Sequence, residues 1–219
     1  MVLFLLPMAA FSETQNTAVI DDETPRSGLV RVLLASLGEP RTLDLQLSAA
    51  YHVADSDIVL PAGAKVALSI NNNGKIKLSY AGQSWVLDGE ATLLRGVEHA
   101  SLQIQQALGA SAYPADLTIR SVEKKNGYYL EAIAVIRVED YLSGVLSYAI
   151  ISTAPAEALK AQTVVSRTYT MMAVENNTDN RYDLVDTGAD QIYRGSPEEN
   201  VACDEAVRET TGCILTYND

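Results

Sequence analysis

The chain has 219 residues, 47% of them hydrophobic, which is enough for one large domain or two small ones with a buried core. Its 28 acidic and 16 basic side chains give a formal net charge of -12 at pH 7. This charge repels phosphate backbones and anionic lipid surfaces, so nucleic acid is not an expected partner.

Residues 1–12 contain the apolar run MVLFLLPMAAF. Roughly ten apolar residues are too few to span a bilayer, and they fit the hydrophobic part of a signal peptide. Ala10 and Ser12 are small enough for cleavage before Glu13, so residues 1–12 are predicted to be a signal peptide remnant. Because no Lys or Arg precedes the run, a short buried segment is the alternative. Residues 13–26 are polar and acidic and are predicted to be a disordered leader.

From residue 28 to residue 137 the pattern is that of β-strands. Short segments rich in Val, Ile, Leu and Tyr alternate apolar and polar residues with a period of two. Asn73-Gly74 and Asn126-Gly127 each separate two such segments and are typical of a tight type I′ hairpin turn. The predicted strands are GLVRVLLAS, KVALSI, KIKLSY, SWVL, LTIRSVE and YYLEAIAVIRV.

After Arg137 the apolar spacing becomes helical. A short amphipathic stripe is formed by Tyr141, Leu142, Val145 and Leu146. A longer helix is predicted with Pro155 in its first turn and Asn176-Asn177 at its exit. Its predicted apolar stripe is Ala158, Ala161, Val165, Tyr169 and Met172.

The remaining chain predicts a third helix, from Ser196 to Thr211, because a Ser-x-x-Glu capping box precedes it and Gly212 follows it. Short strands are predicted at residues 191–193 and 214–217. Strands first and helices second indicate an α+β fold, with a strand-rich N-terminal half containing hairpins and helices packed on it in the C-terminal half.

Cys203 and Cys213 are the two cysteines of the chain. A helix that contains Cys203 and ends before Cys213 separates their Cα atoms by roughly 13 Å, at about 1.5 Å of rise per residue. A disulfide needs a Cα separation below about 7 Å. We therefore predict two separate, half-buried thiols.

Residues 141–167 read YLSGVLSYAIISTAPAEALKAQTVVSR. The helix start P-A-E-A-L-K-A-Q, the S-R-T-Y that follows it and the later G-x-x-Q-x-Y-x-G together resemble the SpoIID/LytB domain, the module of stage II sporulation protein D and of amidase enhancer proteins. The resemblance covers residues 28–219 and implies a peptidoglycan-binding domain. It also implies shortening at the C-terminal end, where family members continue to a Gly-Gly-x-Thr segment.

Family members typically read Y-L-x-G-V-V-x-x-E-M-P before that helix, and the resemblance implies that this glutamate is the general acid/base of a lytic transglycosylase. Here the glutamate position is Ala149, followed by Ile150 and Ile151. Alanine can neither protonate a departing oxygen nor accept a proton. Between Leu142 and Ala156 the chain has no Asp, Glu or His. The resemblance therefore implies a catalytically degenerate relative.

Two alternatives stay open. An active lytic transglycosylase would use another carboxylate, such as Glu157, although Glu157 is also a typical surface charge at a helix start. Glu139 and Asp140 are likewise typical N-terminal charges of the short helix. A decayed gene product without function is the other possibility.

The resemblance further implies that Lys160, Gln162, Arg167, Gln191 and Tyr193 line a glycan groove. A solvated polar face explains the helix residues among them equally well. The partners implied are peptidoglycan glycan strands and a cell-wall amidase, in the periplasm or cell envelope.

Many family members carry a cysteine pair in a D-x-C-D-x-x-x-C-Q segment, which the resemblance links to zinc. The matching positions here are Val185 and Asp190, and the only histidines are His52 and His99. A closed zinc site prefers thiolate and imidazole ligands. We therefore expect no metal and no cofactor.

Overall fold

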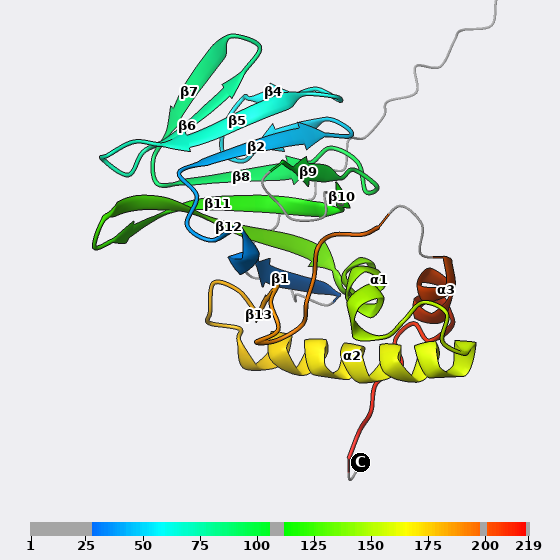
Figure 1. The fold of residues 1–219 in the computed structure, drawn as a ribbon. Coiled ribbons are helices and arrows are strands. Elements are labelled where there is room, and N and C mark those ends of the chain that lie inside the picture. Colours follow the sequence, from blue (N-terminus) through cyan, green and yellow to red (C-terminus); the bar gives the residue numbers. More distant parts are fainter. Residues whose placement is uncertain (1–27, 106–111, 198–200, 218–219) are drawn as a thin grey trace, which may run out of the picture.

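The computed structural model describes residues 28–105, 112–197 and 201–217, and its described elements run from β1 to α3 (Figure 1). The signal peptide remnant and the leader predicted for residues 1–26 lie outside the described residues. The elements are β1 Leu29–Leu33, a 3-10 helix Ala35–Leu37, β2 Thr42–Leu47, β3 Tyr51–Val53, β4 Val59–Leu60, β5 Lys65–Ile70, β6 Ile76–Tyr80, β7 Gln83–Leu87, β8 Glu90–Arg95, β9 Leu102–Ile104, β10 Ala112–Tyr113, β11 Ala115–Lys124, β12 Gly127–Arg137, α1 Val138–Ala149, α2 Ala156–Asn176, β13 Leu184–Val185 and α3 Val201–Glu209.

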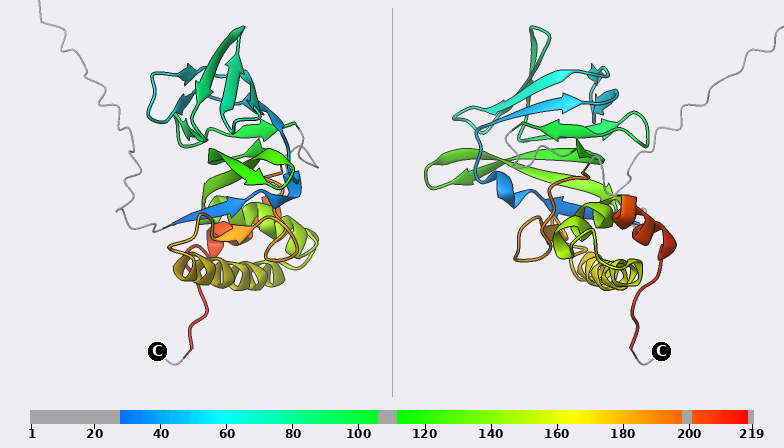
Figure 2. Two further views of the ribbon diagram at one scale, coloured as in Figure 1. Left: turned by 90° about the vertical axis from the view of Figure 1, so that its left-hand side faces the viewer. Right: turned by 45° about the vertical axis from the view of Figure 1, so that its right-hand side comes forward.

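The strands form two sheets. The seven-stranded sheet has the order β13-β1-β12-β11-β8-β3-β4, and the six-stranded sheet has the order β10-β9-β2-β5-β6-β7. The helices gather at one end of the molecule and β5, β6 and β7 at the other (Figure 2). Alternate residues of β2 and β5 are buried, as the period-two pattern predicts. The predicted α+β fold is confirmed.

Hairpins form at both predicted turns, between β5 and β6 and between β11 and β12. The type I′ geometry is wrong, however, because only the glycines have positive φ angles, 75° at Gly74 and 121° at Gly127. In the first turn, the Gly74 amide donates to the Asn71 carbonyl at 3.2 Å. A type I turn followed by a glycine at positive φ fits this pattern and needs no left-handed asparagine.

The helical layer packs on β1 and β12, and α1, α2 and α3 contact one another. The predicted stripe of α1 is confirmed, since all four of its residues are buried. No helix in the described ranges is long and apolar enough to cross a membrane.

The predicted apolar stripe of α2 is wrong. Val165, Tyr169 and Met172 are 36% to 51% exposed. The buried face instead contains polar residues, because partners on α1 and on the loop after β13 bind them. This face consists of Leu159, Thr163, Ser166, Arg167, Thr170, Ala173 and Val174.

Residues 191–193 and 214–217 are not strands, in contrast to the prediction. Gln191 binds α2 through its side chain, and the Leu215 amide donates to the Thr168 hydroxyl at 2.9 Å. The third helix is described from Val201 to Glu209 and is thus shorter than predicted, although residues 198–200 lie outside the described residues. No disulfide joins Cys203, which is buried, to Cys213, which is exposed.

Candidate functional site

Ala149 is the last residue of α1, and its side chain is exposed. The helix ends there because Ile150 has an extended backbone, with φ -149° and ψ 150°, while its amide still donates to the Leu146 carbonyl at 3.2 Å. Ile151, the next residue, is 73% exposed. The position that matches the family glutamate therefore lies at an exposed helix end, and the loop that follows it, residues 150–155, contains no carboxylate.

The carboxylates of α1 lie at its opposite end. Asp140 is nine residues before Ala149, which places it roughly 14 Å away along the helix axis. Its carboxylate binds Arg137 Nε at 2.8 Å, and Glu139 binds Arg167. Neither residue can replace an acid at position 149 without a large rearrangement of the helix.

Glu157 lies in the first turn of α2. Its side chain is 85% exposed and forms an ion pair with Lys160, which also approaches Glu209 of α3 at 3.4 Å. Hydrogen bonding to Glu157 raises the pKa of Lys160. Glu157 thus has the place and partner of a surface charge at a helix start, and Lys160 joins α2 to α3.

Two of the predicted groove residues, Gln162 of α2 and Gln191 of the loop after β13, bind the same residue of α2, Ser166. Gln162 Nε2 donates to Ser166 Oγ at 3.3 Å, and Gln191 Nε2 donates to the Ser166 carbonyl at 3.3 Å. The Thr170 hydroxyl donates to Gln191 Oε1 at 2.9 Å. Gln162, Ser166, Thr170 and Gln191 form a polar cluster, which we call the amide cluster. Both glutamine side chains are half-buried, so they keep one side toward solvent.

Arg167 lies inside the helical layer and is 2% exposed. Its guanidinium donates to both carboxylate oxygens of Glu139, at 2.7 and 3.0 Å, and to the Cys213 carbonyl at 3.1 Å. These bonds tie α1, α2 and the segment after α3 together. A binding role for Arg167 stays a prediction, and the geometry supports a structural one.

Tyr193 is fully buried, and burial raises its pKa well above the ordinary value. Its ring packs against Tyr141, with centroids 4.9 Å apart, and edge-on against Tyr113, at 5.7 Å. It also lies against Gly144, where a Cβ atom would stand 2.5 Å from Tyr193 Cε2. The sequence reasoning missed this role of Gly144, although the glycine is part of the Y-L-x-G-V pattern. A contact role for Tyr193 with glycan likewise stays a prediction.

The segment after β13 occupies the positions of the family cysteine pair. The Val185 amide donates to Asp190 Oδ2 at 2.8 Å, and the Tyr169 hydroxyl donates to Asp190 Oδ1 at 2.7 Å. One carboxylate therefore closes this loop and attaches it to α2. Val185 has no donor atom for zinc, and both oxygens of Asp190 are engaged. The described residues include no group of three His, Cys, Asp or Glu side chains placed to hold a metal. The residues present do not fit a zinc site.

Asp186 lies in the same segment and is 0% exposed. Burial raises the pKa of its carboxyl, while hydrogen bonds from Ser36 and the charge of Arg194 act in the opposite direction. Because the pKa of Asp186 is higher in the folded state than in the unfolded state, protonated Asp186 favours folding, and its contribution to the free energy of unfolding is largest at acid pH. This contribution is lost as the pH rises from the ordinary pKa of 3.8 through the folded value.

We expect the stability of the natural chain relative to Asp186→Asn to fall as the pH rises above 3.8 and then to level off. Urea unfolding of both proteins across this pH range measures the difference and cancels the titration of the other carboxylates. A relative stability that rises with pH would show that Ser36 and Arg194 outweigh the burial of the carboxyl.

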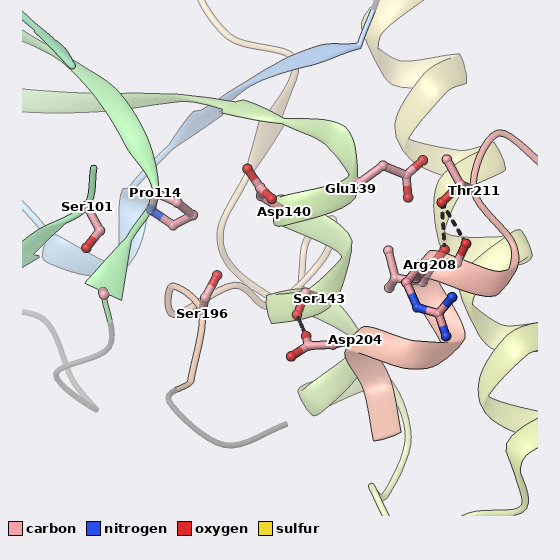
Figure 3. Close-up of a pocket in the computed structure, with 11 residues that line it drawn as sticks. Ser101, Pro114, Glu139, Asp140, Ser143, Ser196, Asp204, Arg208 and Thr211 are labelled. Carbon is pink, nitrogen blue, oxygen red and sulfur yellow. Dashed lines mark hydrogen bonds between the residues drawn. The ribbon is translucent and has the colours of Figure 1, made fainter. Parts of the chain in front are cut away.

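A pocket of about 540 Å³ lies between the sheet edge at Ser101 and Pro114 and the helices α1 and α3 (Figure 3). Its walls carry the carboxylates of Asp140 and Asp204, and the Ser143 hydroxyl donates to Asp204 (Figure 3). The sequence reasoning gave Asp204 no role, because only the packing of α3 against α1 brings it to this pocket.

Residues 126–217 match the family described as stage II sporulation protein, SpoIID. This part of the chain is similar to the SpoIID family. The match begins at the β11–β12 turn and contains the three described α-helices and every predicted site residue. An uncharacterized protein of Brachyspira hyodysenteriae is 36% identical over 83 residues. These residues are 37% of this chain and 23% of that protein, so the chain spans less than a quarter of this relative's length. The SpoIID resemblance stated from the motifs is confirmed for residues 126–217, and its extension to residues 28–125 stays a prediction.

Proposed function

We propose that this SpoIID-family protein binds peptidoglycan glycan strands without cleaving them. The family makes it a sporulation-related or cell-wall-related protein. The observation that carries the proposal is the exposed Ala149 at the end of α1, followed by a loop without a carboxylate. Glycosidic cleavage requires a carboxyl group within hydrogen-bonding reach of the departing oxygen.

The amide cluster supports the binding part of the proposal. Each glutamine amide has two donors and an acceptor, and the bonds to Ser166 and Thr170 use only some of them. The remaining groups suit the hydroxyl and acetamido groups of a glycan. Lys160 is the third predicted groove residue with an accessible side chain, 25% exposed.

The test uses glycan strands without stem peptides. We expect the purified chain to bind them and to release no anhydromuropeptide-type products. Gln162→Ala and Gln191→Ala should each weaken binding roughly two- to tenfold, the value of one hydrogen bond. Gln83→Ala, an exposed glutamine on β7, is the matched control and should not change binding. Turnover comparable to that of an intact family member would overturn the proposal.

Restoring the acid extends this experiment. Ala149→Glu alone should give little or no activity, because Ile150 and Ile151 change the loop that would have to place the carboxyl within about 3 Å of the transferred proton. Replacing Ala149-Ile150-Ile151 by Glu-Met-Pro should give more activity than the single substitution. Full activity from the single substitution would show that only the acid is missing.

A second candidate function is an active lytic transglycosylase that uses another carboxylate. The pocket with Asp140 and Asp204 is the observation that favours it, because Glu139, Asp140 and Asp204 bring three carboxylates to one cavity. Any turnover would then be abolished by Asp204→Asn or Asp140→Asn. If Glu157 is the acid instead, Glu157→Gln would abolish it.

The proposed location is the periplasm or cell envelope, where the proposed substrate lies and where the signal peptide predicted for residues 1–12 would direct the chain. A cell-wall amidase is the proposed protein partner. An increase in amidase activity on addition of the purified chain would support this partner.

A further inference from the structure

A pocket of about 270 Å³ lies between the 3-10 helix that follows β1 and the β11–β12 hairpin. It forms because the chain after β1 leaves β12 for a few residues. The Leu34 amide donates to the Ala132 carbonyl at 2.9 Å, and the Leu130 amide donates to the Pro40 carbonyl at 2.8 Å. Residues 35–39 bulge away from β12 between these two bonds, and the pocket lies under the bulge.

The bulge is held in place from behind. The Ser36 amide donates to Asp186 Oδ1 at 2.9 Å, and Asp186 is 0% exposed. Leu33, Leu37 and Val122 give the pocket an apolar side. Ligand pockets typically measure about 300–1,000 Å³, so this one is at the small end of the range. It therefore suits a small molecule or a single side chain with a short aliphatic part.

The charged side chains that line the pocket are Glu39, Lys124 and Glu131, so one negative charge is left without a counterpart. Lys124 Nζ contacts Glu39 Oε1 at 2.5 Å. Hydrogen bonding to Glu39 raises the pKa of Lys124 most, and the charge of Glu131 contributes less. Arg120, which lies opposite Glu131 in the strand pair, binds Glu90 at 3.3 Å. Both cations near Glu131 are thus engaged with other carboxylates.

Glu131 is the acidic group of this pocket that has lost hydration without gaining a partner. Its Oε1 atom is buried and accepts no hydrogen bond from any residue that the structure describes. Burial of a charged oxygen is unfavourable unless a donor or a cation replaces the lost water. The side chain is half-buried and lines the pocket, so a cation in the pocket can approach the other carboxylate oxygen, which shares the charge.

We propose that this pocket binds a primary ammonium group on a short aliphatic chain, the chemistry of a lysine side chain and of small alkylamines. The ammonium binds the accessible oxygen of Glu131, and the aliphatic chain lies against Leu33, Leu37 and Val122. A guanidinium fits less well, because its planar fork binds both oxygens of a carboxylate and Oε1 is inaccessible. The inference does not depend on glycan binding.

The test is a titration of the ¹⁵N-labelled full chain with Nα-acetyl-lysine N-methylamide, followed by amide chemical shifts. We expect saturable shifts at residues 33–39 and 122–132, with a Kd of about 1 mM for one charged hydrogen bond and a small apolar contact. The norleucine derivative, which has a methyl group in place of the ammonium, should bind at least roughly tenfold more weakly. The arginine derivative should also bind more weakly than the lysine derivative.

Glu131→Gln should weaken binding of the lysine derivative roughly tenfold or more. The matched control is Glu123→Gln, which removes an exposed carboxylate from the opposite face of β11 and should leave binding unchanged. Glu131→Gln should also leave Tm unchanged or raise it, because it removes a charge without a partner. A fall in Tm of more than about 3 °C would show that the carboxylate is already satisfied and would overturn the proposal.

Two further probes distinguish the sources of the ammonium group. Tighter binding of acetyl-Gly-Lys-Gly-amide than of n-pentylamine would indicate the side chain of a polypeptide, and equal or weaker binding would indicate a free amine. The proposal fails if none of these amines gives a saturable shift in the pocket. It also fails if the lysine and norleucine derivatives bind equally well, or if Glu131→Gln has no larger effect than Glu123→Gln.

Discussion

Glu139→Gln should destabilise the protein by about 3–5 kcal/mol, because it leaves a buried guanidinium without its anion. Arg167 is 2% exposed, whereas the side chain of Glu139 is 36% exposed. The reverse change, Arg167→Met, leaves a carboxylate that water can still reach. Arg167→Met should therefore destabilise the protein less than Glu139→Gln, even though it also removes the hydrogen bond from Arg167 to the Cys213 carbonyl.

Urea unfolding of the two single variants and of the double variant measures this asymmetry. The double variant should be more stable than the sum of the two changes predicts, because it leaves no unpaired charge. Arg208→Met is the matched control. Its partner Glu205 is 59% exposed and its own side chain is 70% exposed, so the loss should stay within about 0.5 kcal/mol. Equal effects of Glu139→Gln and Arg208→Met would mean that the buried pair does not hold the layer together.

The same pair explains why the sequence predicted α2 as a helix but gave it the wrong buried face. Helical spacing and a proline in the first turn are local signals, and they are sufficient for the existence of the helix. Which face is buried depends on Glu139, which is 28 residues away from Arg167 along the chain. The apolar residues Val165 and Met172 suggested the opposite face, because no single-sequence pattern shows a distant partner for a buried charge.

Strands and hairpins were predictable because their sequence signals are local too. Period-two alternation and the Asn-Gly turns act within a few residues, so β5, β6, β11 and β12 could be placed from the sequence. The parallel pair of β1 with β13 could not, because Val32 pairs with Leu184 across most of the chain. Residues 191–193 have strand-like composition, yet the side-chain bonds of Gln191 to α2 replace a strand ladder.

For the candidate site, the sequence placed Gln162 correctly on the long helix but Gln191 wrongly on a strand, and it could not tell exposed from buried positions. Tyr193 and Gln191 are two residues apart, and only Gln191 reaches solvent. The bond from the Val185 amide to Asp190 was also missed, because the resemblance only shows that two cysteines are absent. Which interactions form at the two cysteine positions depends on the fold of the loop after β13.

Gly144→Ala should destabilise the protein by about 3 kcal/mol, although alanine is the better helix former by about 1 kcal/mol. A Cβ atom at position 144 would stand 2.5 Å from Tyr193 Cε2 and 2.6 Å from the Gly195 carbonyl oxygen. The tyrosine ring is fixed by Tyr141 and Tyr113, and the carbonyl belongs to the backbone, so neither can move away at low cost.

Thermal unfolding should show this as a fall in Tm of roughly 6–12 °C, at 2–4 °C per kcal/mol for a chain of this size. Gly188→Ala is the control, because a Cβ atom there meets nothing within 4 Å, and it should leave Tm nearly unchanged. Combining Gly144→Ala with Tyr193→Leu removes the ring but not the Gly195 carbonyl, so the second substitution should recover only part of the loss. An unchanged Tm for Gly144→Ala would contradict the close approach of α1 to the 193–195 segment, and with it the packing that positions Gln191 beside α2.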